Sequence, residues 1–372
     1  MSGFFMAEDK NRVSLTIDGE VFSGWLSVSI ASNIRSLART FELQTTRSLK
    51  DGARVQSITP GKEVIVKIGE DVVATGFVTS VAMQYNGSSI AITVSGASKT
   101  SNLEDCTIPA DKPRQYANRT VAEVLTTLCN YFGIEVIDEV GAIQRSDFNA
   151  GVAETVQQSI VKLLKTRAVL ASDDELGRLI ISNVANAADA TDALEVGKNV
   201  LSASRKRDIR NRFYTYAAVG QQTNPLSENA TSPELVRTAT DETFSRTERT
   251  KTFQLPGNAT AQKLQSWICL VRDQAVASSD QVFEYTVCGW RQSNGDLWKK
   301  NTYVAVKDDV LGIKKRLLIS SAKYQLSANG MTTALTVEPA DAFLVTDAAD
   351  KTKAKDTGGD LSGIIKNSGK IK

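Results

Sequence analysis

Near the start of the sequence, apolar and polar residues alternate with a period of two, as in half-buried β-strands. The apolar members of these runs are Val13, Leu15, Ile17, Val64, Val66, Ile68, Ile90, Ile92 and Val94. The dipeptides Asp18-Gly19 and Asn86-Gly87 interrupt the alternation and favour tight β-hairpin turns. Residues 1–96 are therefore predicted to form a first antiparallel β-barrel.

Beyond these strands the apolar residues recur at helical spacing. One helical face is formed by Val121, Val124, Leu125, Leu128, Cys129 and Phe132. Thr120 and Glu123 have the spacing of an N-terminal capping box, and Gly133 is suited to end the helix. A second amphipathic run lies at 156–164, so residues 97–194 are predicted to form an α+β domain.

The remainder of the chain returns to strand patterns around a polar interruption. Residues 195–222 and 283–345 have strand character and together are predicted to form a second, discontinuous β-barrel. Between them, 223–282 is predicted to be an inserted domain with one helix. Residues 346–372 are poor in apolar side chains and are expected to be a flexible tail. The predicted fold class is α+β and predominantly β.

Two hairpins that contain Asn-Gly resemble each other. The strands before their turns read Ser80-Val81-Ala82-Met83-Gln84-Tyr85 and Ser321-Ala322-Lys323-Tyr324-Gln325-Leu326. Further upstream the chain reads Val64-Ile65-Val66-Lys67 and Val304-Ala305-Val306-Lys307. Thr93-Val94 and Thr336-Val337 follow their Asn-Gly turns at the same distance. These matches indicate an internal duplication, and two unrelated hairpins of a common type are the alternative.

Charge and hydropathy exclude several classes of protein. Lys and Arg number 44 against 42 Asp and Glu, so the net charge of +2 gives no global attraction to nucleic acid or anionic membranes. No stretch approaches the roughly 20 apolar residues of a membrane-spanning helix, and the first residues lack the pattern of a secretion signal. Folding in the cytoplasm is therefore expected.

The sequence contains no histidine, which removes the commonest general base and metal ligand. No phosphate-binding glycine loop is present, and the four cysteines lack the spacing of metal or redox sites, so they are expected to be reduced, buried thiols. The acidic run Asp173-Asp174-Glu175 is predicted to be a solvated hairpin turn and not a carboxylate pair or Ca²⁺ loop. No catalytic, metal or cofactor residue is predicted.

The densest local charge is basic and includes Arg205, Lys206 and Arg207. A solvated strand face is one interpretation of this run, and contact with phosphate or an acidic partner is the other. These three residues are the candidate partner-interface residues. The four tryptophans are too dispersed to form a stacking platform for single-stranded nucleic acid, so specific nucleic-acid binding is not expected.

The chain resembles the baseplate hub (tail) proteins of Mu-like contractile phages and prophages. The matching strings are Leu15-Thr16-Ile17-Asp18-Gly19, Gly24-Trp25, Arg210-Asn211-Arg212-Phe213-Tyr214-Thr215-Tyr216, Gly289-Trp290 and Leu297-Trp298. The resemblance implies a structural homotrimer that adapts a six-fold tail tube to a three-fold spike and encloses a central channel. None of these strings is a catalytic signature, so the chain is expected not to be an enzyme.

The resemblance also implies the partners and the location of the protein. The implied partners are further copies of the chain, the tail tube protein, the tail spike protein and, as an additional candidate, the tape-measure protein. The implied location is the baseplate of a virion tail assembled in the bacterial cytoplasm. A tail-associated cell-wall hydrolase, housed in residues 223–282, is the alternative function.

Overall fold

The computed structural model describes residues 10–48, 58–87, 89–141, 145–164, 169–184, 187–221, 234–258 and 260–343. These residues form two compact units. Unit 1 contains the described residues up to 164 together with 169–212 and 274–343. Unit 2 contains 213–221, 234–258 and 260–273. The predicted tail at 346–372 lies outside the described residues.

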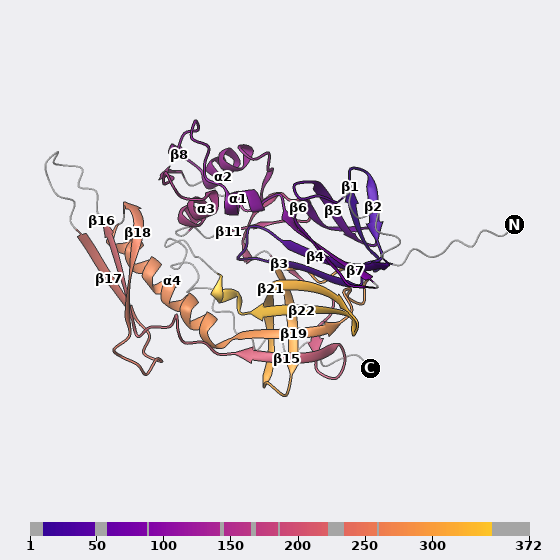
Figure 1. Ribbon diagram of the computed structural model, residues 1–372. Helices are drawn as coiled ribbons and strands as arrows, with labels where there is room; N and C mark the ends of the chain where they lie inside the picture. The colour runs from indigo at the N-terminus through magenta and orange to yellow at the C-terminus, as the bar shows by residue number, and fades with distance from the viewer. Residues whose placement is uncertain are drawn as a thin grey trace. The chain divides into compact units, whose positions relative to one another are not determined.

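Unit 1 is built around one sheet of 14 strands (Figure 1). We call its first part the first half-sheet, formed by β1 (Val13–Ile17), β2 (Glu20–Ser23), β3 (Ser27–Asn33), β4 (Thr40–Ser48), β5 (Glu63–Ile68), β6 (Asp71–Tyr85) and β7 (Ser89–Ser98). The second half-sheet is formed by β13 (Ala188–Asp189), β14 (Leu194–Glu195), β15 (Val200–Lys206), β19 (Val282–Cys288), β20 (Thr302–Asp308), β21 (Ile313–Ser327) and β22 (Gly330–Glu338). A short 3₁₀ turn, Ala340–Ala342, follows β22.

The two half-sheets repeat one strand order, which confirms the predicted duplication. Neighbouring strands run β3-β4-β7-β6-β5 in the first and β15-β19-β22-β21-β20 in the second. The central long strands, β6 and β21, each have 15 residues. Each also has a β-bulge at the same place, between Val78 and Ser80 in β6 and between Ile319 and Ser321 in β21.

Strand pairing corrects one detail of the predicted repeat. Val81 lies opposite Val94, and its counterpart Ala322 lies opposite Leu335, not Val337. The two Thr-Val pairs are therefore not equivalent and differ by two residues. Because side chains alternate with a period of two, this offset keeps the same face toward the core and leaves the hydrophobic pattern intact.

The strands of the two half-sheets form one continuous sheet, whereas two closed barrels were predicted. The reason is that β21 of the second half-sheet pairs with β3 of the first and does not close onto its own half. One hydrophobic cluster therefore runs through both half-sheets, and Leu15, Leu43, Tyr285 and Trp290 are among its fully buried side chains. All four tryptophans are buried.

An α+β part follows the first half-sheet and ends before β13, which the predicted 97–194 domain included but which pairs with β20 of the second half-sheet. Its elements are α1 (Ser101–Asp105), β8 (Gln115–Arg119), α2 (Val121–Asn130), β9 (Val136–Asp138), β10 (Ser146–Asn149), α3 (Val156–Leu164), β11 (Leu170–Asp173) and β12 (Leu179–Ser182). Thr120 and Glu123 form both hydrogen bonds of the predicted capping box at the start of α2. Helices α2 and α3 place their apolar faces in one buried cluster with β12.

Unit 2 is a three-stranded sheet with a helix. Its strands are β16 (Thr215–Gln221), β17 (Glu234–Thr240) and β18 (Thr250–Asn258), and the helix α4 (Ala261–Asp280) begins within it. Strand β16 was expected in the second barrel, but it pairs with β17 and β18. The strand pattern was therefore correct and its sheet was wrong, since an alternating pattern does not specify its neighbours.

The cysteines are free, and only Cys129 is fully buried as expected, since Cys106 and Cys269 are half-buried. Cys129 is buried, and burial raises the pKa of its thiol to about 12. Cys288 is exposed at the end of β19, where a buried thiol was predicted. An alternating strand carries residues to both faces, so its apolar neighbours did not fix the direction of this side chain.

Replacement of Leu43 by Ala tests the core of the sheet. Leu43 is fully buried, so Leu43→Ala is expected to lower the free energy of unfolding by about 2–5 kcal/mol. Leu26→Ala is the matched control because Leu26 is 59% exposed, and its expected effect is below about 0.5 kcal/mol. Urea denaturation followed by circular dichroism measures both. Equal effects of the two substitutions would contradict this assignment of the core.

Candidate functional site

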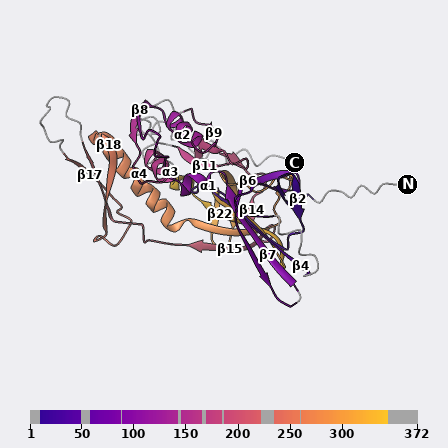
Figure 2. The ribbon, with the colours of Figure 1, turned by 45° about the horizontal axis from the view of Figure 1, so that its top comes forward.

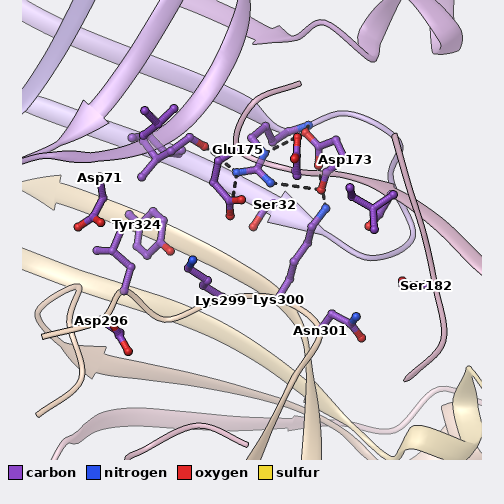
Figure 3. A pocket seen from close by; sticks show the side chains of 18 of the residues that line it. Ser32, Asp71, Asp173, Glu175, Ser182, Asp296, Lys299, Lys300, Asn301 and Tyr324 are labelled. Atoms are coloured by element: carbon purple, nitrogen blue, oxygen red, sulfur yellow. Dashed lines mark hydrogen bonds and ion pairs between the residues drawn. The ribbon is translucent and has the colours of Figure 1, made fainter. Parts of the chain in front are cut away.

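A cavity of about 210 Å³ lies within unit 1 where three parts of the chain meet (Figure 3). Arg39, in the loop before β4, and Asp71 come from the first half-sheet region, and Asp173 comes from the α+β part. Lys300, in the loop before β20, and Tyr324 come from the second half-sheet region. The lining is therefore rich in charged side chains contributed by distant stretches of sequence.

Asp173, the last residue of β11, holds two cations in this cavity wall. Its Oδ2 accepts hydrogen bonds from Nε and from the backbone N–H of Arg39, both at 2.9 Å. Its Oδ1 accepts from Nζ of Lys300 at 2.8 Å. The side chains of Asp173, Arg39 and Lys300 are only 1%, 5% and 10% exposed. This buried charge cluster joins all three parts of unit 1.

The remaining donors of Arg39 are also satisfied. Nη1 donates to the carbonyl oxygen of Val73 at 2.7 Å, and Nη2 donates to the carbonyl of Asp173 at 3.3 Å. The carboxylate of Glu175 lies 3.6 Å from the guanidinium and supplies a second negative charge. A buried guanidinium with this many partners is held in one orientation.

The electrostatic balance favours an ionised Asp173. Burial alone would raise the pKa of Asp173, but the adjacent Arg39 and Lys300 outweigh burial and hold that pKa below its ordinary value. Both carboxylate oxygens already accept hydrogen bonds from these cations. The arrangement is suited to holding three chain segments together more than to proton transfer.

Two other polar residues that line the cavity, Asp71 and Tyr324, also have partners. Asp71 forms an ion pair with Arg291 at 2.7 Å, and Arg291 also donates to the carbonyl oxygen of Ile68 at 3.1 Å. The hydroxyl of Tyr324 donates to the carbonyl of Trp298, and burial raises the pKa of Tyr324. Among the described residues there is no group of three His, Cys, Asp or Glu side chains that could hold a metal ion.

The acidic run that contains Asp173 was wrongly predicted to be wholly solvated. The hairpin is present, since β11 and β12 pair and Asp174 caps the turn by accepting from the backbone N–H of Leu176 at 3.0 Å. Asp173 itself, however, points into the protein. Its two cationic partners are 134 and 127 residues away in sequence, and no local pattern could identify them.

The candidate interface residues lie elsewhere. Arg205 and Lys206 are the last residues of β15, and Arg207 follows them. Lys206 and Arg207 are exposed, while Arg205 is half-buried with its guanidinium 5.5 Å from the ring centre of Phe283. None of the three lines the cavity. The structure therefore places these residues on the β15 end of the sheet and leaves their role as a prediction.

Removal of the Asp173 charge tests the buried cluster. Asp173→Asn leaves Arg39 and Lys300 without their shared carboxylate, so the free energy of unfolding is expected to fall by about 3–5 kcal/mol. Glu175→Gln is the control because that side chain is 37% exposed, and its cost is expected to stay below about 1 kcal/mol. Chemical denaturation compares the two. A loss from Asp173→Asn no larger than that of the control would contradict a stabilising cluster.

The same variant has a defined pH dependence. The pKa of Asp173 is lower in the folded state than in the unfolded chain. The ionised carboxylate therefore stabilises the fold fully above the unfolded-state pKa of about 3.9. This stabilisation is lost as the pH falls from there toward the folded-state pKa. The difference in Tm between the wild type and Asp173→Asn is therefore expected to narrow below about pH 4. A difference that stays constant down to about pH 2 would contradict an ionised, ion-paired Asp173.

Comparisons with known proteins match successive parts of the chain to phage baseplate families. Residues 12–98 match the N-terminal domain of Mu phage baseplate assembly protein GpP-like. Residues 100–183 match the second domain of baseplate hub protein gp44-like, and residues 259–346 match the fourth domain of Mu phage baseplate assembly protein GpP.

Whole-chain similarities agree with these matches. The chain is 31% identical over 366 residues to baseplate hub protein gp44 of Escherichia phage Mu, covering 95% of this chain and 94% of that protein. The crystal structure of the 43 kDa tail protein of prophage MuSo2 from Shewanella oneidensis superposes with a TM-score of 0.78 at 28% identity, covering 90% of this chain and 100% of that one. The tail protein from Neisseria meningitidis MC58 shares the fold, with a TM-score of 0.75 at 20% identity and coverage of 91% and 98%. The chain belongs to the family of Mu-like phage baseplate hub proteins.

Proposed function

We propose that this chain is the structural hub of a contractile phage or prophage tail baseplate and acts there as a homotrimer. The trimer adapts a six-fold tail tube to a three-fold spike and encloses an axial channel. Its location is the virion tail, after assembly in the bacterial cytoplasm. The support is kinship with a protein named a baseplate hub, combined with the repeated half-sheets of unit 1.

The repeat carries the proposal physically. A ring made of three identical chains has three-fold symmetry, yet two similar half-sheets in each chain give six related units around one axis. Such a ring can match a six-fold partner through the repeated elements. It can match a three-fold partner through the elements that occur once per chain, such as the α+β part and unit 2. The proposed partners are the tail tube, the spike and the tape-measure protein.

A catalytic role has less support than a structural one. The hydrolase alternative assigned catalysis to residues 223–282, of which 234–258 and 260–282 are described. There, Phe253 and Trp267 pack edge to face with ring centres 6.5 Å apart, and Gln265 donates to the carbonyl of Thr238 at 3.0 Å. Clearing of peptidoglycan by the purified protein, abolished by one carboxylate substitution, would support the alternative.

No helix within the described ranges is long and apolar enough to cross a membrane. The proposed contacts are with other tail proteins and with further copies of the chain. We propose that Arg205, Lys206 and Arg207 serve mainly in such protein contacts.

The oligomeric state is the most direct test of this function. Light scattering coupled to gel filtration is expected to give a mass about three times the 40.2 kDa of one chain. The trimer mass is expected to persist on dilution, since a hub that carries contraction force needs an extensive interface. A monomer mass that does not change with protein concentration would contradict the homotrimer.

The channel proposal makes a separate prediction about DNA. DNA carries one negative charge per roughly 1.7 Å, so a strongly basic channel wall would retain it. With a net charge of only +2, the protein is expected to bind duplex DNA weakly and with strong salt dependence. Fluorescence anisotropy across a salt titration measures this affinity. Sub-micromolar binding at physiological salt, lost when Arg205, Lys206 and Arg207 are changed together to Ala, would contradict the conduit and assign these residues to DNA.

A further inference from the structure

The bulge in each long strand separates a paired first half from a second half that can accept another strand. Before the bulge, β6 pairs with β5 and β21 pairs with β20. After it, Ser321–Leu326 of β21 lies between β22 and β3. The equivalent stretch of β6, residues 80–85, pairs with β7, and within the described part of the chain no strand lies on its other edge.

Strand β15, the terminal strand of the second half-sheet, also has an edge that can accept another strand. Strand β15 is the counterpart of β3, because Ser204 lies opposite Glu284 just as Ser29 lies opposite Glu42. Strand β3 is paired on both sides, by β4 and by β21. Among the described strands, β15 is paired by β19 alone. Each half-sheet therefore has two strands that can form such a joint, β3 and β6 in the first and β15 and β21 in the second. Inside the chain β3 is joined to β21, which leaves β6 and β15 with an open edge among the described strands.

The open edge of β6 carries exposed apolar side chains. Tyr85 and Met83 are 79% and 49% exposed. Tyr324, the counterpart of Met83, is 7% exposed where β3 covers it, and Ala322, the counterpart of Val81, is fully buried. Figure 2 shows β4 and β7 extending side by side toward this end of the sheet. An apolar strand edge left open is a template for pairing with another chain.

We propose that residues 80–85 of β6 in one copy pair antiparallel with residues 203–208, at the end of β15, in the next copy. The occupant is a second copy because the chain already contains this joint between β21 and β3. The inference deepens the proposed homotrimer and rests on it. The joint is head to tail, so repeated copies form a closed ring when the rotation between neighbours closes.

The internal joint also gives the register of the proposed one. Ile30 lies opposite Tyr324 and Ser29 lies opposite Gln325. Transferring these pairs to their counterparts places Arg205 of one copy opposite Met83 of its neighbour, and Ser204 opposite Gln84. Backbone hydrogen bonds then continue the sheet from chain to chain, as in other cases of strand addition.

Side-chain chemistry across the proposed joint is complementary. The aliphatic stems of Arg205 and Arg207 would cover the face formed by Val81, Met83 and Tyr85. A guanidinium near Tyr85 adds a favourable contact with the aromatic face. The basic run thus acts through its position on a joining strand. The intermolecular joint is more polar than the intramolecular one, where Ile30 and Ser32 occupy the places of Arg205 and Arg207.

Two single-cysteine variants test the joint when they are produced together. Chains with Gln84→Cys and chains with Ser204→Cys, one of them tagged, are co-expressed with Cys288→Ser in both, since Cys288 is exposed. Directly opposed residues of antiparallel strands have Cα atoms about 4.5–5.5 Å apart, which a disulfide spans. Mild oxidation is expected to give a mixed, cross-linked dimer. Gln84 and Ser204 are both exposed, so folding is expected to be unaffected.

The matched control moves one cysteine by a single residue. Gln84→Cys with Ala203→Cys places the two thiols on opposite faces of the sheet, so its yield is expected to be at least about tenfold lower. Each variant expressed alone is expected to remain uncross-linked, since the joint is head to tail.

The outcomes separate the joint from the trimer. A trimer mass with the opposed pair unlinked, or with both pairs linked equally, would overturn the strand pairing and leave the homotrimer standing. Cross-linking of either variant alone would replace the head-to-tail joint by a symmetric one. A monomer mass with the opposed pair unlinked would overturn both proposals.

Discussion

The antiparallel pairing of β21 with β3 is the constraint on which the rest of unit 1 depends. It joins two half-sheets of the same strand order into one sheet and lets one hydrophobic cluster run through both. It also brings Asn33, at the end of β3, close to Lys300, whose Nζ lies 3.4 Å from the Asn33 carbonyl oxygen. Without this pairing, Lys300 and Arg39 would not be placed to share Asp173.

The buried charge cluster complements the sheet in a different way. Apolar burial is non-directional, so a hydrophobic core alone holds three chain segments together without fixing their orientation. A carboxylate that bonds to two buried cations does fix it, because any shift leaves a charge without its partner at a cost of several kcal/mol. This rigidity would suit a subunit with the proposed role between a tail tube and a spike.

Local features of the fold were predictable from sequence, and features that depend on distant residues were not. Hairpin turns, the capping box at Thr120 and the duplication follow from spacing within short windows. The burial of Asp173 does not, because its cations lie more than a hundred residues away and the surrounding acidic run is typical of a solvated turn. For the same reason β16 was recognised as a strand but assigned to the wrong sheet. The basic run at Arg205 was singled out by charge, whereas its place on an edge strand became visible only through the strand order.

Electron microscopy of the purified protein tests the central claim most directly, which is that two half-sheets per chain build a ring of six related units. End-on averages calculated without imposed symmetry are expected to show a closed ring with an axial opening and six similar densities that alternate in two kinds. Rings of another order, open filaments, or compact particles without an opening would contradict the account.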